Sequence, residues 1–270
     1  MENVFREKLL EGKVAFITGG GSGINQGIAE RLAAQGAKAF LVGRTKEKLD
    51  AAAAAIAAKG GTARGFAADV RDATAMTAAF ADCRKTFGEI DILVSGAAGN
   101  FPAPALGMSP NGFKSVVDID LLGTFNTCRL GFEHLRKPGA SIINISASQS
   151  FAPAALQVHV CAAKAGVDMV TRVLAMEWGP MGVRVNSIVP GPIEGTEGMA
   201  RLAPGDEGKK KVVEMVPLKR MGTREDIASM ALFLCTPAAS YVTGAVLVCD
   251  GGLSLAGTGM RMLDALAAGG

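Results

Sequence analysis

A glycine-rich turn near the N-terminus has the residue types and the setting of a phosphate-binding site. The turn spans residues 19–23 and directly follows residues 14–18, an apolar run that predicts a buried strand. A helical pattern begins at Ile24. Glycines let the backbone approach a ligand, and the free N–H groups and dipole of a helix N-terminus favour an anion. With strand and helix both present, the turn predicts a dinucleotide pyrophosphate site; for the turn alone, a plain tight loop is the alternative.

The spacing of this turn differs from the commonest G-x-G-x-x-G pattern. It reads Thr18-Gly19-x-x-x-Gly23-x-Asn25, so Asn25 stands where a third glycine is often found. Because the third glycine allows close packing of helix on strand, we expect a slightly looser approach there without loss of binding.

An arginine after the second predicted strand bears on the choice of nucleotide. Arg44 follows the apolar residues 39–42, and no acidic residue precedes Glu47. An acid at this place holds the ribose 2′-hydroxyl of NAD, whereas an arginine suits a 2′-phosphate. Arg44 therefore favours NADPH, the alternative being an ordinary surface arginine.

Strand-like and helix-like patterns alternate along the chain. Strands are predicted at residues 14–18, 39–42, 63–68, 90–94, 141–145, 183–189 and 245–248, and helices after residue 23 and at about 51–58, 73–87, 111–135, 158–178 and 223–235. Thr223 and Asp226 have the spacing of a capping box. This alternation predicts one α/β domain over residues 1–270, a Rossmann-type doubly wound parallel sheet of about seven strands with helices on both faces.

The carboxyl ends of parallel strands meet at one edge of such a sheet, where ligands bind. That edge should collect Gly19, Arg44, Asp69, Ala97, Ser146 and Pro190. The stretch after Pro190 is rich in Gly and Pro and too long for an ordinary connection, so we predict a mobile lid at about residues 190–215. The basic run 209–211 predicts the solvated start of a helix.

The composition excludes several classes of protein. The chain has 49% hydrophobic residues and a net charge of +3 over 270 residues. This balance gives no reason to expect binding to nucleic acid or to a membrane surface. Residues 1–13 lack the apolar stretch of a signal peptide, and residues 267–270 do not read Ser-Lys-Leu. Five dispersed cysteines predict reduced thiols in a cytoplasm, and the scatter of ligand-type residues predicts no metal site.

By these motifs the chain resembles the classical short-chain dehydrogenase/reductase family over nearly its whole length. The matching pieces are the turn at 18–23, Asp69-Val70, Ala97-Ala98-Gly99, Lys164, residues 190–193 and Asp250-Gly251-Gly252. Within that family it is similar to the 2,4-dienoyl-CoA reductases, especially the peroxisomal type. That similarity is carried by residues 97–101, 118–120, 156–159, 191–198 and 240–246.

The resemblance implies a cofactor site and an assembly. The cofactor is expected to contact Gly19, Gly21, Ser22, Gly23, Ile24, Arg44, Asp69, Val70, Ala97, Lys164, Pro190, Gly191, Ile193 and Thr196. Members of this family are usually tetramers, so a homotetramer is expected. The two long helices and the apolar C-terminal segment are candidate interfaces.

The chain lacks the acid of a carbonyl reductase. In this family a tyrosine four residues before the lysine protonates the nascent alkoxide, but Val160 holds that position here, and the single tyrosine, Tyr241, has no lysine four residues later. The usual serine position falls at Ala147. An alkoxide needs a well-placed acid, whereas the dienolate formed from a conjugated thioester needs hydrogen-bond donors and a water that protonates carbon. The sequence thus favours reduction of C=C.

Two further residues are implied as catalytic by the resemblance. Asp120 occupies the active-site asparagine position of the family, and with Lys164 it is taken to organise the proton-donating water. Because Lys164 should favour the ionised carboxylate, Asp120 is expected to orient the water without being the acid. The alternative is a buried ion pair with a structural role only.

Substrate-contacting residues follow from the same resemblance. Arg71 and Arg201 match positions that contact acyl-CoA substrate, and Phe101 is expected to pack on the acyl chain; each arginine has the alternative of a solvated surface charge. His159 is left out as a packing residue. We therefore expect NADPH-dependent reduction of a 2,4-dienoyl-CoA to a 3-enoyl-CoA. An enoyl-thioester reductase and a catalytically silent NADPH-binding regulatory protein remain as alternatives.

Overall fold

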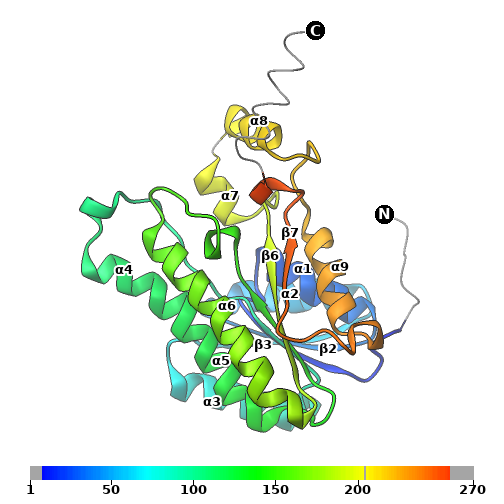
Figure 1. The fold of residues 1–270 in the computed structure, drawn as a ribbon. Coiled ribbons are helices and arrows are strands. Elements are labelled where there is room, and N and C mark those ends of the chain that lie inside the picture. Colours follow the sequence, from blue (N-terminus) through cyan, green and yellow to red (C-terminus); the bar gives the residue numbers. More distant parts are fainter. Residues whose placement is uncertain (1–7, 204, 256–270) are drawn as a thin grey trace.

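A single parallel sheet organises the part of the chain that the structure describes. The computed structural model describes residues 8–203 and 205–255. Within those residues, seven strands lie in the order β3-β2-β1-β4-β5-β6-β7 (Figure 1). Their bounds are β1 (Val14–Thr18), β2 (Lys38–Gly43), β3 (Thr62–Ala67), β4 (Ile92–Ser95), β5 (Ser141–Ile145), β6 (Arg184–Pro190) and β7 (Val246–Cys249). Every pairing is parallel, which confirms the predicted fold class.

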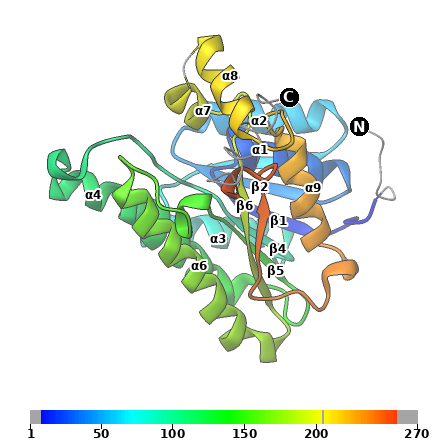
Figure 2. The same ribbon diagram turned by 45° about the horizontal axis from the view of Figure 1, so that its top comes forward.

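Helices cover both faces of this sheet, as Figure 2 shows. The α-helices are α1 (Gly23–Ala34), α2 (Lys46–Ala58), α3 (Ala73–Phe87), α4 (Pro110–Val117), α5 (Gly123–Gly131), α6 (Val158–Trp178), α7 (Glu197–Leu202), α8 (Gly205–Met215) and α9 (Arg224–Leu234). A π-helical turn, η2 (Asp118–Leu122), joins α4 to α5. The 3-10 turns are η1 (Ala105–Gly107), η3 (Phe132–His134), η4 (Ser148–Ser150), η5 (Gly179–Met181), η6 (Pro237–Ala239) and η7 (Leu253–Leu255).

The core lies in two layers because successive strand residues point to opposite faces. In β1, Ala15 and Ile17 pack into the cluster under α1 and α9, whereas Val14 and Phe16 pack into the cluster under α3 and α6. Phe16 stacks on Phe80 of α3 with ring centroids 4.1 Å apart. Every residue of β1 is buried, as expected for a strand covered on both sides.

The strand order changes direction between β1 and β4, and this opens a crevice at their carboxyl ends. In Figure 1, α7 and α8 lie above this edge, next to the ends of β6 and β7. The predicted lid at 190–215 therefore contains two helices. The basic run 209–211 is helical, as predicted, but it lies in the middle of α8, which begins at Gly205; α7 was missed.

Most predicted boundaries agree with the structure within one or two residues. The capping box of α9 is confirmed, with Thr223 accepting from the Asp226 N–H and Asp226 accepting from the Thr223 N–H. Helix α2 begins at Lys46, well before the alanine run. The predicted long helix at 111–135 is present as one continuous helical run, 110–134, but it contains the π-turn η2 around Asp120 and ends in a 3-10 turn, neither of which was predicted. Predictions for residues 1–7 and 256–270 lie outside the described residues.

Candidate functional site

The predicted site residues follow the carboxyl ends of neighbouring strands. Within the described residues the glycine turn follows β1, Arg44 follows β2, Asp69 to Arg71 follow β3, Ala97 to Phe101 follow β4 and Pro190 closes β6. All of these strands run in the same direction, so their ends share one edge of the sheet.

The glycine turn has the features that a bound pyrophosphate requires. Gly19 and Gly23 have positive φ values of 72° and 57°, which side-chain-bearing residues rarely adopt. Ser22 is the N-cap of α1, but its side chain makes no capping hydrogen bond. The first N–H groups of this twelve-residue helix therefore lack a side-chain acceptor, and an anion would supply one. Gly21 and Ile24 lie beside these groups.

Asn25 replaces the third glycine with a specific contact. Its Nδ2 donates to the carbonyl of Gly96, at 2.7 Å, and so joins the glycine turn to the segment after β4. A Cβ built on Gly96 would lie only 2.0 Å from Asn25 Oδ1, and one on Gly19 would lie 2.7 Å from Asn25 Nδ2. The expected looser approach was wrong, because the asparagine side chain fills this space and hydrogen-bonds across it.

Charged groups gather just after the ends of β2 and β3. Arg71 donates to Asp69 through Nη2 at 2.6 Å and Nε at 3.0 Å. These bonds hold the pKa of Asp69 below its usual value, and the positive charge of Arg44 lowers it further. Arg44 is exposed. Arg71, predicted to contact substrate, is thus held by Asp69, next to Val70.

Asp120 lies on the π-helical turn and is almost completely buried, with 1% of its surface exposed. Its Oδ1 accepts the backbone N–H of Gly99, at 2.7 Å. A π-turn leaves backbone groups out of the regular ladder, and here the Thr124 hydroxyl donates to the Asp120 carbonyl at 2.7 Å. Asp120 Oδ2 has no hydrogen-bond partner among the described residues, so this oxygen is available to a water.

Lys164 reaches Asp120 from α6. Its Nζ lies 3.3 Å from Asp120 Oδ2, and it donates to the carbonyl of Ile145 at 2.9 Å. Lys164 is itself 5% exposed. An ammonium has three N–H donors, and among the described residues Lys164 uses one of them, in the hydrogen bond to the Ile145 carbonyl. The structure brings together the two residues that were predicted to act as a pair.

No phenol accompanies this pair within the described residues. Val160, at the position of the family's tyrosine, is buried with only 3% exposed, and Tyr241 is fully exposed after α9. The buried hydroxyl of Ser146 has no hydrogen-bond partner in that same part of the chain. The arrangement can orient a water but holds no side-chain acid for an alkoxide.

His159 is a feature that sequence reasoning set aside. It is fully buried beside Val160, and neither ring nitrogen has a partner among the residues described. Phe101 packs edge-on against it, with ring centroids 4.6 Å apart. In the sequence, His159 directly precedes Val160, the position of the family's tyrosine. That position alone does not show whether the histidine packs in the core or takes part in function.

The lid lies against the glycine turn. Thr196 is the N-cap of α7. Its Cγ2 would be the atom nearest to a Cβ built on Gly23, at 3.8 Å. Glu197 pairs with Lys48 of α2 at 2.8 Å, and hydrogen bonding to Lys48 lowers the pKa of Glu197. Arg201 donates to the carbonyl of Asn100 at 3.2 Å.

The base of the lid is fixed to the sheet. Ile193 pairs with Gly222 in an isolated bridge. A Cβ on Gly191 would lie 2.6 Å from the Asp250 Cα, so this position after Pro190 accepts only glycine without a shift. The predicted cofactor residues of this segment therefore lie on its anchored part.

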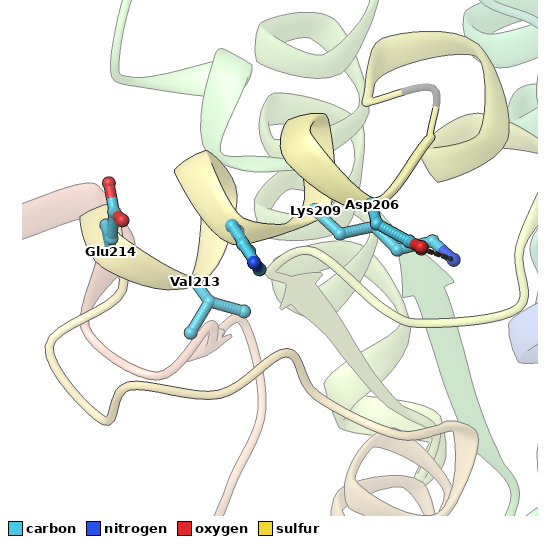
Figure 3. A pocket seen from close by; sticks show the side chains of 5 residues that line it. Asp206, Lys209, Val213 and Glu214 are labelled. Carbon is cyan, nitrogen blue, oxygen red and sulfur yellow. Dashed lines mark ion pairs between the residues drawn. The ribbon is translucent and has the colours of Figure 1, made fainter.

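Other parts of the described structure add no second centre. A surface hollow on α8 is lined by Asp206, Lys209, Lys210, Val213 and Glu214 (Figure 3), none of which is a predicted site residue. No cluster of three or more metal-ligand side chains occurs in residues 8–203 and 205–255. No helix of these residues is long and apolar enough to cross a bilayer.

Comparison with known proteins agrees with this geometry. Residues 19–254 match the family model described as enoyl-(acyl carrier protein) reductase. The peroxisomal 2,4-dienoyl-CoA reductase [(3E)-enoyl-CoA-producing] of Rattus norvegicus is 48% identical over 93% of this chain and 86% of its own, and that of Danio rerio is 46% identical over 93% and 84%.

A solved structure is similar over most of its length as well. A short chain dehydrogenase from Bacillus anthracis has a TM-score of 0.81 and 38% identity, covering 90% of this chain and 97% of its own. With its sheet order, its glycine turn and these matches, the chain belongs to the short-chain dehydrogenase/reductase family.

Proposed function

We propose that this protein is an NADPH-dependent 2,4-dienoyl-CoA reductase, which converts a 2,4-dienoyl-CoA to a 3-enoyl-CoA in the degradation of unsaturated fatty acids. The relatives at 46% and 48% identity carry the name of this activity. The observation that carries the proposal is the buried pair Asp120–Lys164, at 3.3 Å, with Val160 in place of a phenol.

The residues present fit a nicotinamide dinucleotide. The uncapped start of α1, with Gly21 to Ile24, binds the pyrophosphate. Arg44 binds the 2′-phosphate, and its exposed guanidinium leaves it free to do so. An N–H of Lys164 that is not used by the Ile145 carbonyl donates to the nicotinamide ribose. When bound, the cofactor supplies a hydride.

The chain's own residues handle the charge and the proton. Hydride addition at C5 of the substrate moves the double bonds to C3=C4 and C1=C2 and leaves the negative charge on the thioester oxygen. A water held by Asp120 Oδ2 and Lys164 then gives a proton to C2 and becomes hydroxide, which takes up a proton from solvent; the thioester carbonyl re-forms, and C3=C4 remains. Asp120 Oδ2, which lies 3.3 Å from Lys164 Nζ, orients the water and accepts its hydrogen bond.

Three residues are proposed to contact the acyl-CoA. Phe101 is about one-third exposed at the end of β4, where its ring can pack on an acyl chain. Arg71 and Arg201 supply positive charge at the mouth of the site, with side chains 40% and 60% exposed. Both are held by neighbours, Arg71 by Asp69 and Arg201 by Asn100.

We further propose a homotetramer in the cytoplasm. Large apolar side chains lie exposed along α6, where Met169, Val173 and Met176 are 55%, 42% and 79% exposed, and Phe125 of α5 is 45% exposed. A stripe of this kind is typical of a subunit interface. All five cysteines, which lie within the described residues, are free thiols, in keeping with a reducing compartment.

The test is an assay of NADPH consumption with three thioesters. We expect oxidation of NADPH with 2,4-hexadienoyl-CoA, a product whose remaining double bond is at C3 by NMR, and no oxidation with acetoacetyl-CoA, a ketone. Equal turnover of 2-hexenoyl-CoA would indicate an enoyl-thioester reductase. NADPH binding without turnover of 2,4-hexadienoyl-CoA or 2-hexenoyl-CoA would contradict the proposal. It would favour a catalytically silent NADPH-binding protein.

A further inference from the structure

The lid carries an acid into the region after β2 where Arg44 lies. Glu197 is the first residue of α7, and Oε1 of its carboxylate lies 2.8 Å from Lys48 Nζ. Lys48 lies in the first turn of α2, four residues after Arg44. Hydrogen bonding to Lys48 lowers the pKa of Glu197 below its ordinary value, and the positive charge of Arg44 lowers it further. The carboxylate is therefore close enough to interact with both cations.

Two contacts of the glycine turn fix this region relative to the start of α1. A Cβ built on Gly21 would lie 3.3 Å from the backbone carbonyl carbon of Lys48, so the start of α2 packs directly on the turn. A Cβ built on Gly23 would lie 3.8 Å from Cγ2 of Thr196, the residue before Glu197. The starts of α2 and α7 thus both border the glycine turn that is proposed to bind the pyrophosphate.

The ion pair between Lys48 and Glu197 is open to solvent, with side chains 53% and 65% exposed. Exposed ion pairs contribute little free energy because water screens them. A phosphate monoester carries a charge of about −1.5 to −2 at neutral pH and offers three acceptor oxygens. A nucleotide phosphate is therefore a stronger partner for Lys48 than the carboxylate is.

Glu197 has a second cation on its own helix. Arg201, one helical turn later, has Nη2 at 3.6 Å from Glu197 Oε2, and its Nη1 donates to the carbonyl of Asn100 at 3.2 Å. Among the described residues, the pair with Lys48 is the ion pair that joins α7 to α2. If Glu197 loses Lys48, it keeps Arg201, and α7 keeps its contact with the segment after β4 but not its ion pair to α2.

We propose that Glu197 is a specificity-determining residue that competes with the 2′-phosphate of NADPH for Lys48. Lys48 and Arg44 together bind the phosphate, and Glu197 gives up Lys48 when the phosphate binds, which releases α7 from α2. NADH has no 2′-phosphate and leaves the ion pair in place. This inference rests on the preference for NADPH in the proposed function, and it names the lid residue that responds to the phosphate.

The charge of Glu197 acts against the phosphate as well. An acid near the end of the second strand is the arrangement that favours NAD, because it accepts the ribose 2′-hydroxyl, and it repels a 2′-phosphate. The stretch after β2 has no acid before Glu47, but the lid brings Glu197 next to Lys48. Glu197 therefore reduces the preference for NADPH that Arg44 and Lys48 create.

The experiment uses two nucleotide fragments that differ in the phosphate alone. Affinities of the full-length protein for adenosine 2′,5′-bisphosphate and for 5′-AMP are measured by calorimetry. In Glu197→Gln the bisphosphate should bind about three- to ten-fold more tightly than in the wild type, the value of one exposed ion pair and one like-charge repulsion, while 5′-AMP binds as before. In Lys48→Met the bisphosphate should bind about three- to ten-fold more weakly.

Hydrogen exchange of residues 197–202 measures the response of the lid. In the wild type these amides should exchange faster with the bisphosphate bound than with 5′-AMP bound, because the phosphate releases α7. In Glu197→Gln and Lys48→Met the two ligands should give equal exchange, since the ion pair is already absent. Glu194→Gln, at an exposed acid three residues earlier in the same segment, is the matched control and should change neither affinity nor exchange.

The outcomes separate the two proposals. If the wild type prefers the bisphosphate but Glu197→Gln leaves its affinity unchanged, the ion pair is an ordinary surface contact, and the proposed function stands. Equal exchange with both fragments in the wild type would overturn the release of the lid. Equal affinity of the wild type for both fragments would overturn this inference together with the preference for NADPH. Reduction of 2,4-hexadienoyl-CoA is measured separately and decides the proposed reaction.

Discussion

Asp120 uses its two carboxylate oxygens for different partners. Oδ1 accepts the Gly99 N–H at 2.7 Å, while Oδ2 faces Lys164 Nζ at 3.3 Å and has no hydrogen-bond partner among the described residues. One oxygen therefore fixes the side chain and the other meets the cation and a water. Removing the side chain would leave a buried ammonium without its counter-ion, which costs about 3–5 kcal/mol in folding free energy.

Asp120→Asn is expected to lower kcat with 2,4-hexadienoyl-CoA about 10²-fold. The amide oxygen retains the bond from Gly99, but the negative charge that orients the water is lost. The dissociation constant for NADPH, measured by fluorescence, should change less than three-fold. Asp120→Ala should lose activity as well, and full turnover in either variant would leave Asp120 a structural role only. Asp118→Asn, at a neighbour that pairs with Lys114, is the control.

Arg44 should determine the choice between NADPH and NADH. Arg44→Ala removes a charge-assisted hydrogen bond to the 2′-phosphate, so KM for NADPH is expected to rise about ten- to hundred-fold. The KM for NADH should stay nearly constant, because NADH has no 2′-phosphate. Arg64→Ala, which removes an arginine paired with Asp82, is the matched control. An equal rise in KM for NADPH and for NADH would show that Arg44 does not bind the 2′-phosphate.

Asn25 and Gly96 should behave as a coupled pair. Gly96→Ala places a Cβ 2.0 Å from Asn25 Oδ1, and overpacking of this kind costs about 1–3 kcal/mol. Asn25→Ala removes the clashing amide, so the double variant should be more stable than Gly96→Ala alone. Urea unfolding of the four proteins gives the coupling energy, expected at about 1–2 kcal/mol. If the two substitutions changed the free energy of unfolding additively, the contact between Asn25 and Gly96 would not stabilise the glycine turn.

The sheet was predictable because most of its strands, such as β1, β2, β4 and β5, are short apolar runs bounded by glycine or polar residues. Every residue of β5 is buried, for example, and residues 141–145 read as apolar and β-branched apart from Ser141 and Asn144. Parallel order then follows from the alternation with helices. The edge at which the site residues gather is a consequence of that order.

The details of the site were not predictable from spacing. An α-helix and a π-turn place the same residues in nearly the same positions, so nothing at 111–135 distinguished a regular helix from one that contains a π-turn at Asp120. The bond from Asn25 to the Gly96 carbonyl joins residues 71 apart in the chain, and a local pattern carries no information on it.

The last prediction concerns stability at the start of α9. Arg220 donates two hydrogen bonds to Asp226, and this pairing lowers the pKa of Asp226 to about 2, from an ordinary value of 3.8. A lowered pKa stabilises the fold above the ordinary value, and the contribution is lost as pH falls from about 5 through the folded pKa.

Asp226→Asn should therefore lower the free energy of unfolding by about 1–2 kcal/mol at pH 7, after allowance for solvent screening. The difference from the wild type should shrink as pH falls below 4, because protonation of the wild-type carboxyl has the same effect as the substitution. Asp206→Asn, at a 94% exposed residue that pairs with Lys209, should change stability little at any pH. Urea titrations at pH 7, 5, 4 and 3 measure this, and a difference that stayed constant across them would place the effect of Asp226 in its capping bonds and not in its charge.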